Sequence, residues 1–154
     1  MSTWYYISIW LHIICVSFWL GGMLFLPLAL LPAIKNYPDR AKLLMETGLK
    51  FRFYGYIVLG VLLITGVTNI YLRGINVSVK FFVASRYGNL VIAKFILFLF
   101  IIAISFWHDA HARKRLLDEE HNKKFKIVAR WSGRLLLLIS LTIAFIGVIL
   151  SRGG

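Results

Sequence analysis

Four long apolar stretches dominate this sequence, at residues 4–34, 53–72, 88–111 and 131–151. A helix that crosses the hydrocarbon core of a bilayer needs roughly 20 predominantly apolar residues, and each stretch is long enough. Lipid offers the backbone no hydrogen-bond partners, and the alternating pattern of a membrane β-barrel is absent, so the stretches are predicted to be helices. We therefore predict an all-α integral membrane protein, a four-transmembrane-helix bundle forming a single domain over residues 1–154.

The basic residues are distributed unevenly between the two predicted sides of the membrane. Most of the 18 Lys and Arg residues lie in the segments that join the first span to the second and the third to the fourth. Because such residues accumulate on the cytoplasmic side, both termini are predicted to lie outside. This topology, together with contact with anionic lipid headgroups, accounts for the net charge of +12, so no nucleic-acid partner is expected.

The first span is predicted to be a retained membrane helix rather than a signal peptide. No Lys or Arg precedes it, and no clear small-residue cleavage site follows it. Near its inner end, Pro27 and Pro32 are expected to kink the helix or to convert its last turns into an interfacial extension. The segment 38–50 has helical apolar spacing and is expected to lie along the inner surface before the second span begins.

A histidine inside the first span is the leading candidate for a functional residue, because an ionisable side chain in the hydrocarbon is costly. His12, Cys15, Trp19 and Met23 recur at helical spacing and are predicted to share one face. Imidazole, thiol and thioether together favour copper, particularly Cu(I), whereas neutral imidazole is also the usual axial ligand of haem iron. In the structural alternative, His12 forms a hydrogen bond between helices, and Cys15 and Met23 merely pack.

Lys94 on the third span is predicted to lie at the same membrane depth as His12, as are Thr65 and Asn69 on the second. Lys94 is therefore a candidate cofactor contact. Its long side chain can alternatively extend to the interface, where the ammonium group is hydrated.

A second group of ionisable residues is predicted near the inner membrane face. His108 and His111 end the third span at a spacing that can bind a metal ion, although a solvated helix end has the same pattern. Arg52 opens the second span and Arg134 opens the fourth. Either arginine is a candidate to hold a haem propionate or a lipid phosphate, since guanidinium groups bind such anions through paired hydrogen bonds.

Taken in order, several segments resemble the copper resistance protein D family, particularly its short single-domain bacterial members. These segments are LHIICVSFWLGGMLF, GLKFRFYGYIVLGVLLITGV, SRYGNLVIAKFILFL, FWHDAH and ARWSGRLLLLISL. The resemblance covers nearly the full length and implies a bacterial inner-membrane protein linked to copper uptake or tolerance. His12, Trp19, Lys94 and His108 fit the pattern of that family. The first of these segments, together with METGLKFRF, is also similar to the small haem-binding membrane protoporphyrinogen oxidases.

Three functions remain open from the sequence. The first is copper handling, with a periplasmic copper protein as a candidate partner. The second is a b-type haem protein that exchanges electrons with quinone or acts as a membrane oxidoreductase. His12 and His108 differ in predicted depth by about 20 Å, so its second contact would be Lys94, an open position or a partner chain. The third is an accessory subunit of a larger membrane complex, without a cofactor; a homo-oligomer is a further expectation.

Overall fold

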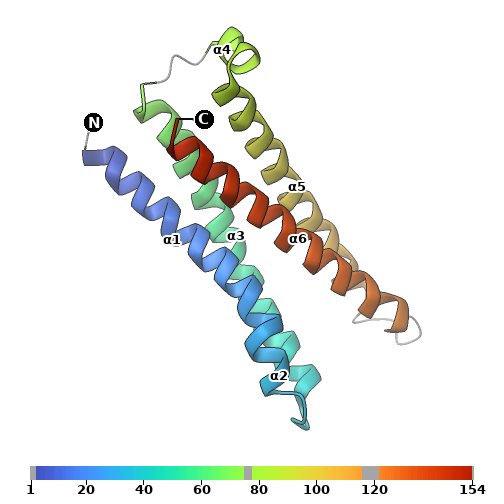
Figure 1. Cartoon of the computed structure of the whole chain (residues 1–154). Helices are drawn as coiled ribbons and strands as arrows, with labels where there is room; N and C mark the ends of the chain where they lie inside the picture. The colour runs from blue at the N-terminus through green and yellow to red at the C-terminus, as the bar shows by residue number, and fades with distance from the viewer. Residues whose placement is uncertain (1–2, 75–77, 116–121, 154) are drawn as a thin grey trace. The chain divides into compact units, whose positions relative to one another are not determined.

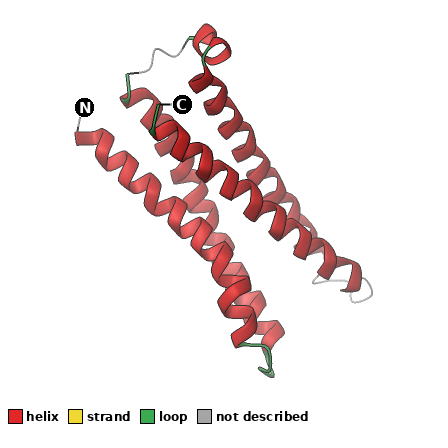
Figure 2. Cartoon of the chain, viewed as in Figure 1, coloured by secondary structure: helices red, strands yellow, loops and turns green. Residues whose placement is uncertain are grey.

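Every regular element of the computed structural model is helical over the residues that it describes, 3–74, 78–115 and 122–153 (Figure 2). Side chains at residues 41, 79, 80 and 108–130 lie outside the description. Four of the described helical segments are long and apolar enough to cross a membrane: Thr3–Ala33, Lys42–Leu72, Arg86–Trp107 and Trp131–Ser151. The predicted all-helical protein with four membrane spans is confirmed.

The chain divides into two compact units between residues 76 and 77. The first unit, called here the first hairpin, contains α1 (Thr3–Phe25), η1 (Leu26–Leu30), α2 (Leu31–Ala33) and α3 (Arg40–Leu72). The second hairpin contains α4 (Val79–Ala84), α5 (Arg86–Arg115) and α6 (Asn122–Ser151). In each hairpin, two long helices lie side by side in opposite directions, α1 with α3 and α5 with α6 (Figure 1). The single domain over residues 1–154 stays a prediction.

The α-helix of the first span changes to a different type of helix at its two prolines, each of which lacks a backbone N–H donor. Pro27 cannot donate to the carbonyl of Met23, four residues earlier, and Pro32 cannot donate to that of Leu28. The chain instead forms the π-helical turn η1, closed by the bond from Leu31 N–H to Leu26 O, and then the short α2. The helix therefore continues past both prolines with an altered turn, and residues Thr3–Ala33 form one long apolar segment.

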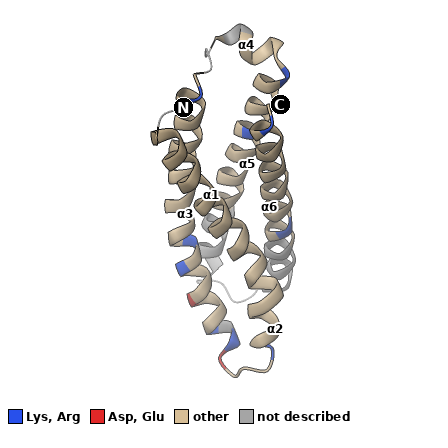
Figure 3. Cartoon of the chain, turned by 60° about the vertical axis from the view of Figure 1, so that its left-hand side comes forward, with Lys and Arg blue, Asp and Glu red and all other residues tan. Residues whose placement is uncertain are grey.

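The second span begins earlier than expected, since α3 starts at Arg40 rather than near residue 53. The segment 38–50, expected to lie along the membrane surface, is continuous with the transmembrane helix from Arg40 onward. Between Arg40 and Phe53 there is no proline, so no backbone N–H donor is missing and nothing interrupts the ladder of hydrogen bonds. The charged residues of the first hairpin gather at the α2–α3 turn and on the first turns of α3, apart from Arg73 (Figure 3).

A sharp corner joins α4 to α5 in the second hairpin. Ser85 is extended and its hydroxyl donates to Phe81 O at 2.7 Å while accepting from Gly88 N–H at 2.9 Å. A Cβ at Gly88 would stand 2.5 Å from Phe81 O, so a larger residue cannot occupy the corner without a shift of the backbone. The Ser85 hydroxyl thus caps the start of α5 and also donates a hydrogen bond to a carbonyl at the end of α4.

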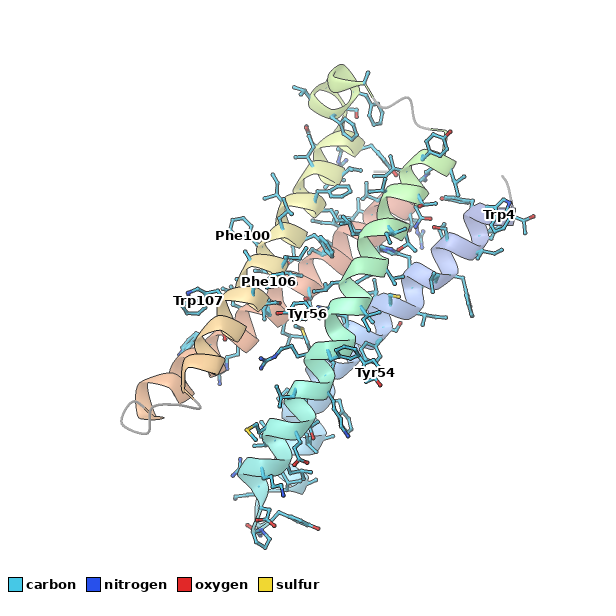
Figure 4. All side chains as sticks on the ribbon, turned by 180° about the vertical axis from the view of Figure 1, so that it is seen from behind. Trp4, Tyr54, Tyr56, Phe100, Phe106 and Trp107 are labelled. Carbon is cyan, nitrogen blue, oxygen red and sulfur yellow. The ribbon has the colours of Figure 1, made fainter. Side chains whose placement is uncertain are left out.

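Large apolar side chains cover the outer surface of the spans. Phe100, Phe106 and Trp107 project from α5, and Trp4 marks the start of α1 (Figure 4). Their exposed fractions are 55%, 60%, 49% and 71%. Apolar side chains so exposed need lipid or another apolar surface around them, which agrees with a membrane protein.

Gly22→Ala is expected to destabilise the first hairpin, because a Cβ at Gly22 would collide with the ring of Phe51. That ring is stacked against Phe18 and Trp19, at centroid distances of 6.0 and 6.2 Å, so it has little room to withdraw. Overpacking of this kind costs about 1–3 kcal/mol of unfolding free energy, measurable by denaturant titration in detergent micelles. Gly21→Ala is the matched control, since nothing lies within 4 Å of a Cβ there. Equal stability of the two variants would contradict this packing.

Candidate functional site

His12 of α1 and Thr65 of α3 form a direct hydrogen bond across the first hairpin, with 2.7 Å between Nδ1 and Oγ1. Thr65 Oγ1 also lies 2.7 Å from Val61 O, and two oxygens this close need a proton between them. The threonine hydroxyl has one proton, so it donates to Val61 O and accepts from His12 Nδ1–H. In the neutral ring, this arrangement leaves the lone pair on Nε2, the atom that can bind a metal ion.

The spacing of residues along both helices produces this contact. On α1 the buried residues recur at intervals of three and four on the face that carries His12: Tyr5, Ser8, Cys15 and Trp19. On α3, Leu59, Leu62 and Thr65 are buried at the same kind of interval. Since threonine in a helix readily bonds to the carbonyl four residues earlier, its proton is used within α3 and a lone pair remains for His12.

Gly66 gives the imidazole of His12 a close approach to α3. The ring atom Cε1 lies 3.8 Å from the position that a Cβ of Gly66 would occupy. This is an ordinary van der Waals distance, so the ring lies against α3 beside Thr65, to which it is hydrogen-bonded. His12 itself is half-buried.

Cys15 and Met23 lie on α1 at different distances from His12. At about 1.5 Å per residue, Cys15 is about 4.5 Å and Met23 about 16 Å from His12 along the axis of α1. Cys15 is buried and Met23 half-buried. Among the described side chains, no three His, Cys, Asp or Glu residues gather around one point where they could hold a metal ion. Met23 is therefore too far from His12 to bind the same ion, and the metal-binding roles of Cys15 and Met23 stay predictions.

Trp19 lies in an aromatic cluster one turn beyond Cys15. Its ring is stacked with Phe51 at 6.2 Å between centroids and 25° between planes. Its Cζ3 also lies 3.0 Å from the position that a Cβ of Gly55 would occupy, so the indole packs against the backbone of α3. This position gives Trp19 a packing role between α1 and α3, and its contact with a cofactor stays a prediction.

The three basic candidates lie in different surroundings. Lys94 is half-buried on α5, and its Nζ lies 3.6 Å from the position that a Cβ of Gly147 would occupy on α6. Gly147 is close to the C-terminal end of α6, where the helix dipole favours a cation. Arg134 is exposed, with its Cζ 5.5 Å from the centroid of the Trp131 ring. Arg52 is half-buried on α3. Their roles as cofactor contacts stay predictions.

His108 and His111 lie in the C-terminal part of α5, whose backbone is helical to Arg115. Their side chains lie outside the described residues, so the predicted metal-binding pair has no described geometry. Lys94 and His108 are fourteen residues apart on α5, which is about 21 Å along the helix axis. The two positions are therefore well separated along α5.

Two polar residues with buried oxygen atoms, Ser8 and Asn69, extend the site beyond the predicted set. Ser8 Oγ and Asn69 Oδ1 are buried and have no hydrogen-bond partner among the described residues. The sequence predicts for Asn69 only the same depth as His12, and it predicts no role for Ser8. The sequence does contain a pattern that indicates them. Ser8 lies four residues before His12, and Asn69 lies four residues after Thr65, so each shares a helix face with a residue of the site.

A chain with four apolar helices of this length, and a hydrogen-bonded histidine inside one hairpin, is a multi-pass membrane protein with a candidate metal ligand in a span. The profile of the family described as copper resistance protein D matches residues 46–150. Because this match covers more than half of the chain, the protein belongs to the copper resistance protein D family, which relates it to copper resistance. The resemblance seen in the sequence is confirmed.

A relative from Aquifex aeolicus (strain VF5), itself described as an uncharacterized protein, is 32% identical over 147 residues. The alignment covers 94% of this chain and 94% of the relative. No solved structure gives a significant match. The family match begins at residue 46, so it includes Thr65 but not His12, whose candidacy as a ligand rests on the geometry of the first hairpin.

Thr65→Val is expected to weaken the first hairpin by about 0.6 kcal/mol, the average for one hydrogen bond between membrane helices. Valine has the shape of threonine but cannot accept the proton of His12 Nδ1. Thr65→Ser keeps the hydroxyl and is the matched control. Nitrogen-15 NMR of labelled histidine gives the second readout: wild-type His12 should have Nδ1 protonated and Nε2 unprotonated. A wild-type ring protonated at Nε2 alone would contradict the assignment.

Proposed function

We propose that this protein binds copper within the membrane and takes part in copper uptake or tolerance, with His12 as the first ligand. The support is membership of the copper resistance protein D family together with the position of His12 inside a span. We further propose that it lies in the bacterial inner membrane with both termini outside, which the basic residues of the connecting segments favour.

The observation that carries the proposal is the hydrogen bond from His12 Nδ1 to Thr65 Oγ1. Metal-binding histidines almost always donate their second ring N–H to a fixed acceptor, which orients the ring and raises the basicity of the ligand nitrogen. Thr65 is such an acceptor, since its own proton is donated to Val61 O. His12 thus has the tautomer and the fixed orientation that a metal ligand needs.

The two sulfur-containing residues that share the His12 face of α1 support copper over harder cations. Thiolate and thioether ligands select Cu(I), and α1 carries Cys15 about one turn from His12 and Met23 farther along. In this proposal the ion passes from His12 and Cys15 toward Met23, and His108 and His111 receive it near the inner membrane face. A periplasmic copper protein is the proposed partner at the outer face.

A b-type haem is the second candidate, favoured by the same ring orientation of His12, because a neutral imidazole is also the usual axial ligand of haem iron. Trp19 and Lys94 would then contact the haem, and Arg52 or Arg134 would bind its propionates. Such a protein would exchange electrons with quinone or act as a membrane oxidoreductase. Copper is preferred because the family is linked to copper resistance by its description.

His12→Ala is expected to remove most Cu(I) binding by the purified protein in lipid nanodiscs, measured by competition with a coloured Cu(I) chelator. Thr65→Val should weaken the affinity by about 10–100-fold, the usual effect of removing the partner of a ligating histidine, and Thr65→Ser should retain it. The matched control is His121→Ala, which changes a histidine in the charged segment between the third and fourth spans. Equal Cu(I) affinity of His12→Ala and wild type would exclude His12 as the ligand.

An optical spectrum of the same preparation, oxidised and reduced with dithionite, separates the two cofactors. A colourless protein that binds Cu(I) through His12 supports the proposal. A Soret band with stoichiometric iron that is lost in His12→Ala would replace copper with haem. A preparation that binds neither copper nor haem before and after reconstitution would contradict both, and would favour an accessory subunit.

A further inference from the structure

Two buried polar atoms near His12 lack a hydrogen-bond partner among the described residues, Ser8 Oγ and Asn69 Oδ1. Ser8 is only 8% exposed. An unpaired polar atom in an apolar interior is costly, and membrane spans offer no bulk water to compensate. In native proteins such atoms usually indicate an ordered water molecule or an ion.

The register of the first hairpin places these two residues at one level. Ser8 precedes His12 by four residues on α1, and Asn69 follows Thr65 by four residues on α3. A step of four residues stays on the same helix face and moves about 6 Å along the axis. Because α1 and α3 are antiparallel and His12 bonds to Thr65, both steps lead toward the end where α1 begins and α3 ends. Ser8 and Asn69 thus form a second polar layer, called here the entrance layer.

We propose that the entrance layer binds water between His12 and the membrane face at which α1 begins. A water molecule can donate to Asn69 Oδ1 and exchange a hydrogen bond with Ser8 Oγ, which pairs both buried atoms. The layer is then the hydrophilic entrance through which a hydrated cation reaches His12. The role toward the cation rests on the proposed function, whereas the water site does not.

Rotation of the Ser8 hydroxyl toward its own helix would pair only one of the two atoms. The Ser8 hydroxyl can rotate toward the carbonyl of Trp4, four residues earlier, as serines in helices often do. That bond would give the Ser8 hydroxyl a partner, but Asn69 Oδ1 would stay buried without a hydrogen-bond donor. The layer is also a poor copper site of its own, since hydroxyl and amide oxygens are hard ligands and Cu(I) prefers sulfur and imidazole. Hydration is therefore the role that fits both residues.

The access of water to His12 can be measured by the rate at which diethyl pyrocarbonate modifies its ring, followed by mass spectrometry in copper-free nanodiscs. Ser8→Ala and Asn69→Leu should each slow this modification by about five- to tenfold, the effect of losing about one hydrogen bond to the entering water. Ser8→Thr keeps the hydroxyl and should react like wild type. Ser17→Ala, at an exposed position of α1, is the matched control.

The direction of the change separates hydration from packing, because loosened packing would make His12 react faster. Unchanged or faster modification in both Ser8→Ala and Asn69→Leu overturns the entrance layer, as does a wild-type His12 that does not react in the folded protein. Slower modification in a protein that binds no Cu(I) supports the layer and contradicts the proposed function. Unchanged modification in variants of a protein that binds Cu(I) through His12 overturns the layer alone.

Discussion

Backbone hydrogen bonding in hydrocarbon is the constraint on which this structure depends. A span must pair its N–H and C=O groups within itself, so each apolar stretch is a helix. The same requirement explains the irregular positions. Where Pro27 and Pro32 lack a donor, the helix changes to a π turn that can pair the remaining groups. At the corner before α5, the hydroxyl of Ser85 supplies bonds that the interrupted backbone cannot make.

With the backbone hydrogen bonds formed within each helix, the packing of α1 against α3 depends on small and polar residues. Lipid is as apolar as leucine, so burial of apolar surface alone does not bring two membrane helices together. The ring of Phe51 occupies the space beside Gly22, and Trp19 packs against Gly55. The bond from His12 to Thr65 joins the same two helices about two turns farther toward the start of α1. These contacts explain why the candidate ligand is held on a packed interface.

The chemistry of His12 follows from that interface. Thr65 uses its one proton within α3 and therefore takes the proton of His12 Nδ1, which leaves the ligand lone pair on Nε2. Ser8 and Asn69 add polar atoms on one side of this pair, and Cys15 adds a buried sulfur on the other. In the proposed function, this order from oxygen through nitrogen to sulfur along the hairpin would let an ion lose its hydration before it meets softer ligands.

Span length, charge and motif order are properties of the chain, so the number of spans, their helical character and the family could be predicted without a structure. The sequence also identified His12, since an ionisable residue in an apolar stretch is visible without a structure. That Thr65 is the hydrogen-bond partner of His12, and that Ser8 has a buried hydroxyl one turn away, became known from the folded hairpin. Helical periodicity gives the face and depth of a residue, but the residue opposite it depends on the packing of two helices, which contacts such as Phe51 with Gly22 set.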